Sequence, residues 1–304
     1  MWKVVGKSLE QEASAAAIWK QAGGAIPHPP QGGTVVLLPK EKSTGRCRIC
    51  GQMRELTREH IPPTAAGNVG RVETHTLEEW LARTGLDEMP GGDTLRHGIE
   101  GYTLCAACNN NTGGSYGGEY LRWASTIAKM MLEQALPIEK LDASTKRRAI
   151  QIVLGSDSDP MKPGAFVRQA LAMLCTVSSD YDLAGTYPAI RRIVLDKILE
   201  PLPAGMNLYL TIFLGPGARL AGPSLAADTS TGDWRWVMEV AFPPLAFLLV
   251  LASKGAIPVN WNISPFTQTA PAVGQIINEM VDLGFGHTIL PGDYRTRTQI
   301  EAGG

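Results

Sequence analysis

The chain has 304 residues, of which 44% are hydrophobic and 19% are charged. This composition is ordinary for a folded globular protein, and the length allows two domains. The formal net charge of −1 at pH 7 excludes binding to nucleic acid through a general excess of positive charge. A protein of this charge that binds nucleic acid needs a local basic surface instead.

Residues 1–40 are expected to form an N-terminal extension. The Ala- and Glu-rich segment Glu10–Gln21 predicts a short helix, and Thr34–Leu38 predicts a strand or an extended tether. The start of the chain lacks the apolar core of a secretion signal, and the apolar run Val240–Ser253 is shorter than the ~20 residues that cross a bilayer. We therefore expect a cytoplasmic protein without a membrane partner.

Basic residues are concentrated between Lys40 and His60, where six lysines and arginines stand beside three glutamates. Such a stretch is either a solvated face of mixed charge or a local surface for phosphate. The candidates for phosphate contact are four arginines: Arg46, Arg48, Arg54 and Arg58.

Four of the five cysteines form two C-x-x-C pairs, Cys47/Cys50 and Cys105/Cys108. Two such pairs supply four thiolates to one tetrahedral zinc ion, and a site with four protein ligands has no open position for chemistry. We therefore predict a structural zinc ion. The fifth cysteine, Cys175, lies in an apolar segment and is expected to be a buried thiol.

Between the two cysteine pairs, Glu55–His60 is expected to be a strand that ends at Pro62-Pro63, since proline cannot continue a ladder. An insertion follows at Thr64–Gly98, with a short helix at Leu77–Arg83. After the second pair we expect a glycine- and asparagine-rich turn at Asn109–Gly118. A helix with a buried apolar face is then expected at Glu119–Gln134.

The C-terminal part reads as helices followed by strands, which predicts an α+β domain at residues 143–304. The expected helices are Lys146–Val153, Gly164–Val177, Pro188–Leu199 and Val273–Leu283. The expected strands are Met206–Leu214, Trp234–Ala241 and Leu245–Leu251. The three predicted units are thus residues 1–40, a zinc-knuckle unit at 41–142, and 143–304.

The residues Glu59-His60-Ile61-Pro62 between the knuckles, with Cys108-Asn109 at the second knuckle, resemble the HNH (ββα-metal) endonucleases. The likeness is to the subtype with two C-x-x-C knuckles around a structural zinc, and it covers about residues 46–131. It implies a treble-clef-like ββα-metal unit that hydrolyses DNA phosphodiester bonds. It also implies His60 as general base, and Glu59 and Asn109 as ligands of a catalytic divalent ion.

The chemistry of these side chains agrees with the roles that the resemblance implies. The pKa of a histidine suits proton removal from water near neutral pH, and the oxygen ligands of Glu59 and Asn109 favour Mg²⁺ or Mn²⁺. Glu59 and His60 would face opposite sides of a regular strand. They can converge on one phosphate only if the strand ends or is bulged there.

The sequence departs from the family pattern before the second knuckle, where the run Glu100–Leu104 lacks the usual asparagine. Asn68 is one candidate to replace it. Three further residues are reserve candidates for metal binding: Asn110, Asn111 and Glu119. The last position of the motif is Asn109 instead of histidine, a variation that the family shows.

Two other functions remain open. The first is a zinc-knuckle protein that binds nucleic acid or acts as a scaffold without catalysis, with His60 a hydrogen-bonded histidine and Glu59 a solvated charge. The second is a subunit of a complex, which an exposed apolar patch at Phe242–Val250 would favour. By analogy with other HNH nucleases, the C-terminal part would sense a ligand, assemble copies of the chain or bind a protein partner. The setting would be restriction or anti-phage defence.

Overall fold

The computed structural model describes residues 2–7, 34–36, 38–70, 72–76, 93–133, 148–178, 181–213, 218–227, 234–252 and 261–283. The predicted helices Glu10–Gln21 and Leu77–Arg83 lie outside these residues. The described part contains both helices and strands, which confirms the expected mixed α and β class. Among these residues, no helix is both long and apolar enough to span a bilayer.

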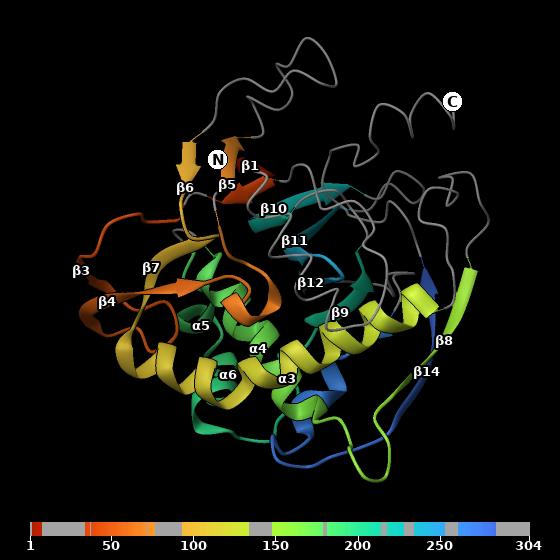
Figure 1. The fold of residues 1–304 in the computed structure, drawn as a ribbon. Coiled ribbons are helices and arrows are strands. Elements are labelled where there is room, and N and C mark those ends of the chain that lie inside the picture. Colours follow the sequence, from red (N-terminus) through yellow and green to blue (C-terminus); the bar gives the residue numbers. More distant parts are fainter. Residues whose placement is uncertain are drawn as a thin grey trace.

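The four cysteines lie around a small antiparallel sheet of order β3-β4-β7, formed by Thr44–Arg46, Met53–His60 and Glu100–Cys105. Helix α3, Ala106–Glu133, begins directly after β7 and runs along the lower face of the molecule (Figure 1). In the β4–β7 pair, Leu56 faces Cys105 and His60 faces Glu100. The register shifts between Thr57 and Arg58 and leaves Thr103 without a partner, so β7 carries a bulge there.

Helix α3 is longer than expected, and the predicted turn at Asn109–Gly118 is wrong. The segment is helical in spite of its glycines, each of which costs about 1 kcal/mol relative to alanine in a helix interior. Its inward positions are fully buried aromatic and apolar residues at helical spacing: Tyr116, Tyr120, Trp123 and Ile127. Their burial offsets the low helix propensity of the outward-facing glycines.

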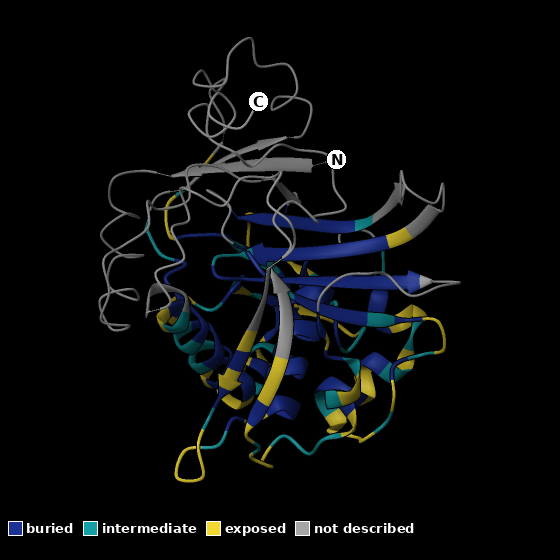
Figure 2. Cartoon of the chain, turned by 90° about the vertical axis from the view of Figure 1, so that its right-hand side faces the viewer, coloured by how far each residue is buried: buried dark blue, intermediate teal, exposed yellow. Residues whose placement is uncertain are grey.

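The C-terminal part is built on an antiparallel sheet of order β10-β11-β12-β9-β13. Its strands are Arg219–Ala227, Trp234–Phe242, Leu245–Ala252, Asn207–Ile212 and Trp261–Asn262. The three predicted strands are confirmed, whereas β10 was missed because Gly222-Pro223 reads as a turn. The structure places this dipeptide at a register shift between Ala221 and Ser224. The central strands are buried (Figure 2).

Helix α4, Pro163–Thr176, confirms the predicted helix in this region and packs between α3 and the large sheet. The ring of Trp123 on α3 stacks on Phe166 of α4, with centroids 3.9 Å apart. Buried residues from Leu38 to Ile277 belong to one hydrophobic cluster, which therefore includes residues of both the knuckle unit and the C-terminal unit. Residues 245–250 lie in the core, so the exposed patch that would favour a complex subunit is not present.

Two of the predicted C-terminal helices are wrong, because the segments form an antiparallel ribbon of strands β8 and β14. These strands are Arg148–Leu154 and Ile277–Leu283, paired along their whole length. Ile152 and Leu154 are buried while Val153 is exposed, which is the alternation of a strand. Strand pairing over a separation of more than a hundred residues therefore overrides the local helical pattern.

The remaining described elements are short. Strands β1, β2, β5 and β6, at Trp2–Lys7, Thr34–Val36, Val72–Thr76 and Asp93–Leu95, form a separate sheet. The predicted helix at Pro188–Leu199 is found as α6, Pro188–Arg191, continued by the π-helical turn η3, Arg192–Asp196. Helix α5, Leu183–Thr186, precedes it. Two 3₁₀ turns, η1 at Thr64–Ala66 and η4 at Ser264–Gln268, complete the set.

Candidate functional site

The sulfur atoms of Cys47, Cys50, Cys105 and Cys108 all lie within 4.8 Å of one another. Those of Cys50 and Cys105 are 3.9 Å apart, and a tetrahedral zinc ion with Zn–S bonds of ~2.3 Å places its sulfurs ~3.8 Å apart. The first pair lies in the turn between β3 and β4, and the second joins β7 to α3. The cluster therefore has the donor set and the spacing to hold one zinc ion.

The thiols of Cys47 and Cys108 are linked by a hydrogen bond that shifts the pKa of each. The pKa of Cys47 falls to about 4, chiefly because the Cys108 thiol donates a hydrogen bond to its sulfur. The same bond, together with burial, raises the pKa of Cys108 far above its ordinary value. Four thiolates at this spacing would repel one another, so a zinc ion bound among them would have to displace protons from the cluster.

Three of the four arginines predicted to contact phosphate have hydrogen-bonding or ion-pair partners within the protein. Arg48 donates a hydrogen bond to the carbonyl oxygen of Thr176 at the end of α4, and Arg46 forms an ion pair of 2.7 Å with Asp182 beside α5. These contacts attach the first knuckle to the C-terminal part. Arg54 and Arg58 on β4 are exposed, and Arg58 also forms an ion pair of 3.6 Å with Glu100. These are the two arginines of the set whose exposed position suits contact with a substrate.

Glu59 is buried, with its carboxylate directed at the bulge in β7. It accepts hydrogen bonds from the backbone N–H of Thr103 (3.1 Å) and of Leu104 (3.3 Å), and from the Thr103 hydroxyl. Burial raises the pKa of Glu59 to about 8, although the hydrogen bonds and Arg48 act in the opposite direction. The carboxylate thus satisfies backbone groups that the bulge leaves unpaired, and Glu59 is not the solvated charge of the non-catalytic alternative.

His60 ends β4 on the opposite face from Glu59 and keeps 20% of its side chain exposed. Its Nε2 lies 3.0 Å from the carbonyl oxygen of His97 and 3.3 Å from Oε2 of Glu100. A carbonyl oxygen only accepts hydrogen bonds, so Nε2 carries the ring proton and Nδ1 carries the lone pair. Burial lowers the pKa of His60, while the charge of Glu100 acts against this shift, so the ring is uncharged at neutral pH.

Asn109 lies at the start of α3 and binds strand β4. Its Nδ2 donates to the carbonyl oxygen of Arg58 (2.9 Å) and to the hydroxyl of Thr57 (3.2 Å). For the side-chain oxygen Oδ1, the structure records no partner within its described ranges. Asn109 therefore joins the start of the helix to the middle of the strand that carries His60, and the structure records no contact between Asn109 and His60 among its described residues.

Asn68, the candidate for the missing asparagine, is buried behind His60. Its Nδ2 donates to the carbonyl oxygens of Pro62 (2.7 Å) and Ile99 (2.9 Å), and its Oδ1 accepts from the N–H of Ile99 (2.6 Å). Gly98 has a φ of +89°, and a Cβ there would lie 2.4 Å from the Asn68 carbonyl oxygen. These contacts fix the loop after His60 against the segment that leads into β7.

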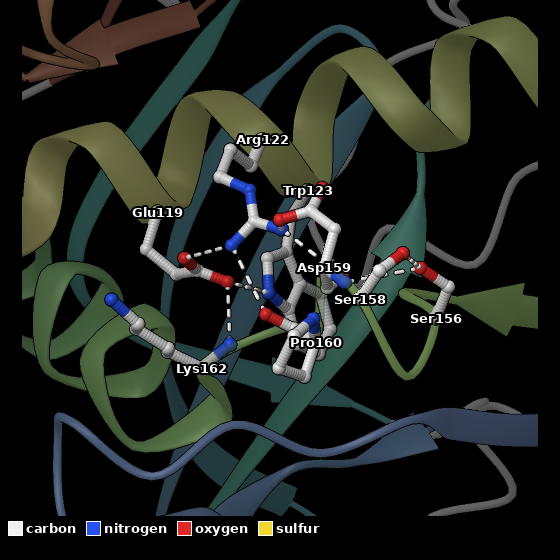
Figure 3. A network of polar contacts seen from close by, with 8 residues as sticks. All are labelled: Glu119, Arg122, Trp123, Ser156, Ser158, Asp159, Pro160 and Lys162. Atoms are coloured by element: carbon white, nitrogen blue, oxygen red, sulfur yellow. Dashed lines mark hydrogen bonds and ion pairs between the residues drawn. The ribbon is translucent and has the colours of Figure 1, made fainter.

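The three reserve candidates do not join His60. Asn110 is exposed on α3, and Asn111 accepts a hydrogen bond from Ser115. Glu119 is buried in a different network, where it accepts from the indole of Trp123, the backbone N–H of Lys162 and the guanidinium of Arg122 (Figure 3). Glu119 therefore connects α3 to the segment before α4.

Glu100 is the residue at this site that the sequence reading missed. It faces His60 across the β4–β7 pair, and its Oε2 is also 3.6 Å from Nε of Arg58. The signal in the sequence is weak, because nothing there sets the register of two strands separated by the long insertion. With the register known, Glu100 is the acidic partner of His60.

Comparisons with known proteins find no matching family model, no matching curated protein and no matching solved structure.

Proposed function

We propose that the chain is an HNH-type endonuclease that hydrolyses DNA phosphodiester bonds with Mg²⁺ or Mn²⁺, around a structural zinc site. The observation that carries the proposal is the placement of His60. An uncharged, partly exposed histidine ends β4 in a ββα unit, with the four-cysteine cluster at the other end of the same strand pair. That is the arrangement which the resemblance of the sequence implies.

In the proposed reaction, His60 takes a proton from water at Nδ1. The water oxygen forms a bond to phosphorus, and the bond from phosphorus to the leaving oxygen breaks. The leaving oxygen keeps the electron pair and takes a proton from solvent water. The exposed guanidinium groups of Arg54 and Arg58 supply positive charge for the phosphate. A base positioned in this way contributes about 10²–10⁴-fold to the rate.

The predicted ligands of the catalytic ion fit this geometry only in part. Oδ1 of Asn109 records no partner in the described part of the chain, so it is a suitable oxygen donor. Both oxygens of Glu59 accept hydrogen bonds from β7, on the face opposite His60. The role of Glu59 as a metal ligand stays a prediction.

A plasmid cleavage assay with Mg²⁺, Mn²⁺ or EDTA, with His60→Ala in parallel, tests the proposal. We expect nicking by the wild-type protein with a divalent ion and none by the variant, at equal zinc content in both. Equal cleavage by the two proteins would remove His60 from the mechanism. The exposed Asn110→Ala serves as the control for the effect of a substitution in this unit.

The alternative is a zinc-knuckle protein that binds nucleic acid or acts as a scaffold without cutting. It is favoured by the Glu59 carboxylate, which serves the β7 backbone, and by Nε2 of His60, which is bound to the carbonyl of His97. This function predicts DNA binding that His60→Ala leaves unchanged, with no cleavage by either protein in any metal. A gel-shift assay on the same samples separates the two functions.

A further inference from the structure

The Glu100 carboxylate on β7 is largely buried and lies beside His60 and Arg58. Its Oε2 is buried and makes no hydrogen bond with any described residue, although His60 Nε2 lies at 3.3 Å and Arg58 Nε at 3.6 Å. Glu59, by contrast, accepts three hydrogen bonds from β7. Buried carboxylate oxygens are rarely left without a hydrogen bond, so the position of this one beside two nitrogen atoms indicates a specific role.

The pairing of strands β4 and β7 fixes the backbone position of Glu100. Glu100 faces His60 directly across the β4–β7 ladder, where side chains of opposed residues lie side by side. Asn68 holds Ile99, the residue before Glu100, by two hydrogen bonds of 2.9 and 2.6 Å. Only 17% of the Glu100 side chain is exposed, so the carboxylate acts on His60 with little screening by water.

We infer that Glu100 is a positioning residue for His60, forming a carboxylate–imidazole pair that orients the ring and stabilises the positive charge it gains as a base. The inference rests on the proposed nuclease function and deepens it. The proton on Nε2 lies between Oε2 of Glu100 and the carbonyl oxygen of His97, which leaves Nδ1 free to accept a proton from water. Arg58 holds the carboxylate from its other side.

Glu59 on β4 and Glu100 on β7 have different roles. Glu59, which adjoins His60 in sequence, completes the backbone hydrogen bonding of the bulge. Glu100, which is 40 residues away in sequence, is the carboxylate that His60 meets. A carboxylate beside the base makes proton uptake by the ring more favourable, because the ring becomes positively charged when it takes the proton.

Two substitutions at Glu100 separate its charge from its hydrogen-bonding capacity. Glu100→Gln keeps an acceptor oxygen and the shape of the side chain, whereas Glu100→Leu removes both the charge and the acceptor. The matched control is Glu55→Gln, which makes the same chemical change on the exposed part of β4, where Glu55 pairs with Lys42. Zinc content, measured on every sample, shows that the cysteine cluster is intact.

The first measurement is the kinetics of plasmid cleavage. We expect kcat to fall about ten- to hundred-fold in Glu100→Gln and further in Glu100→Leu, as part of the ~10²–10⁴-fold that a positioned base contributes. KM should stay within about twofold, and any change should be a decrease, because removing the Glu100 charge releases Arg58 toward the phosphate. Unchanged kcat in both variants would overturn the inference, as would a loss of zinc that accounts for the whole effect.

The second measurement is independent of cleavage and observes the ring itself. The chain has five histidines, so ¹⁵N-labelled histidine with His60→Gln as the reference assigns the His60 ring signals in an NMR spectrum. We expect a single uncharged form with the proton on Nε2, and a displaced Nε2–H signal in both Glu100 variants but not in Glu55→Gln. A proton on Nδ1, or ring signals that do not respond to either Glu100 variant, would overturn the inference.

The two measurements test the nuclease proposal and the role of Glu100 independently. If the wild-type protein cuts no DNA with any metal, the nuclease proposal falls, and the ring signals still decide whether Glu100 and His60 form the pair. If the protein cuts and the Glu100 variants cut equally well, the nuclease stands and the role of Glu100 falls.

Discussion

At one end of the β4–β7 pair, where Leu56 faces Cys105, four sulfurs converge to within 4.8 Å and the first knuckle is attached to α4 and α5 by Arg48 and Arg46. At the other end, where His60 faces Glu100, hydrogen bonds from Asn68 hold the segment before β7, and Arg58 forms an ion pair with Glu100. The first end has four donors that could hold one zinc ion, whereas the second presents a partly exposed imidazole and two exposed arginines. The cysteine cluster and His60 thus lie at opposite ends of one strand pair.

The largest effect is expected at the cysteine end. Cys47→Ser removes one of four thiolates, so the protein should lose its zinc and, with it, folding free energy on the order of 10 kcal/mol. The measurement is zinc content by atomic absorption together with thermal unfolding of the purified protein. Cys175→Ser is the control, because Cys175 is a buried thiol outside the cluster and its loss should leave the zinc content unchanged. Full zinc occupancy in Cys47→Ser would contradict a four-cysteine site.

Glu59 lies between the two ends, and its burial predicts a dependence of stability on pH. Its pKa is about 8 in the folded protein and ordinarily 4.5, so the folded state binds the proton more tightly than the unfolded chain does. The contribution is therefore fully present below 4.5 and is lost as the pH rises through about 8. Glu59→Gln mimics the protonated acid and should flatten this fall, which amounts to a few kcal/mol as an order of magnitude.

Chemical denaturation at several pH values between 4.5 and about 8 gives the free energy of unfolding as a function of pH. The effect is the difference in the slope of this curve between the variant and the wild type. Zinc binding has its own pH dependence, since thiols must lose protons, but it is common to both proteins and cancels in the difference. The exposed Glu55→Gln on the same strand should have the wild-type slope. Equal slopes in wild type and Glu59→Gln would show that the buried carboxylate does not bind a proton in this range.

Asn68 tests the histidine end without touching the cysteines. Asn68→Ala removes three hydrogen bonds to the backbone of Pro62 and Ile99, so we expect a loss of about 2–3 kcal/mol in the free energy of unfolding. Cleavage should fall as well, because the loop after His60 and the segment before Glu100 lose their connection, while zinc stays bound. The exposed Asn110→Ala should change stability by less than about 0.5 kcal/mol. A variant of Asn68 that cuts normally would show that this connection does not position His60.

The two ends of the β4–β7 pair differ in how much of their structure could be predicted from the sequence. The four-cysteine cluster follows from spacing within two short turns, so Cys47, Cys50, Cys105 and Cys108 were found from the sequence alone. Glu100 could not be found in this way, because its meeting with His60 depends on a register set across the insertion and shifted by the bulge at Thr103. The strands β8 and β14 were misread for the same reason. Their partners lie more than a hundred residues apart, and local pattern favoured helices.

The smallest effect is expected on the outer face of helix α3, which lies outside both the cysteine cluster and the His60 end of the strand pair. Gly114 lies in the interior of α3 with open space where a Cβ would stand, so Gly114→Ala should stabilise the protein by about 0.5–1 kcal/mol. Gly164→Ala is the contrasting variant, since its Cβ would lie 2.2 Å from the carbonyl oxygen of Thr269 and should destabilise the protein. Denaturant unfolding measures both changes.

If Gly114→Ala is more stable but cuts DNA more slowly, the added methyl group obstructs the substrate, and the glycine-rich face of α3 lies against DNA. If it is more stable and cuts at the wild-type rate, DNA reaches His60 without contacting this face, and the low helix propensity of the segment has no role in the proposed reaction.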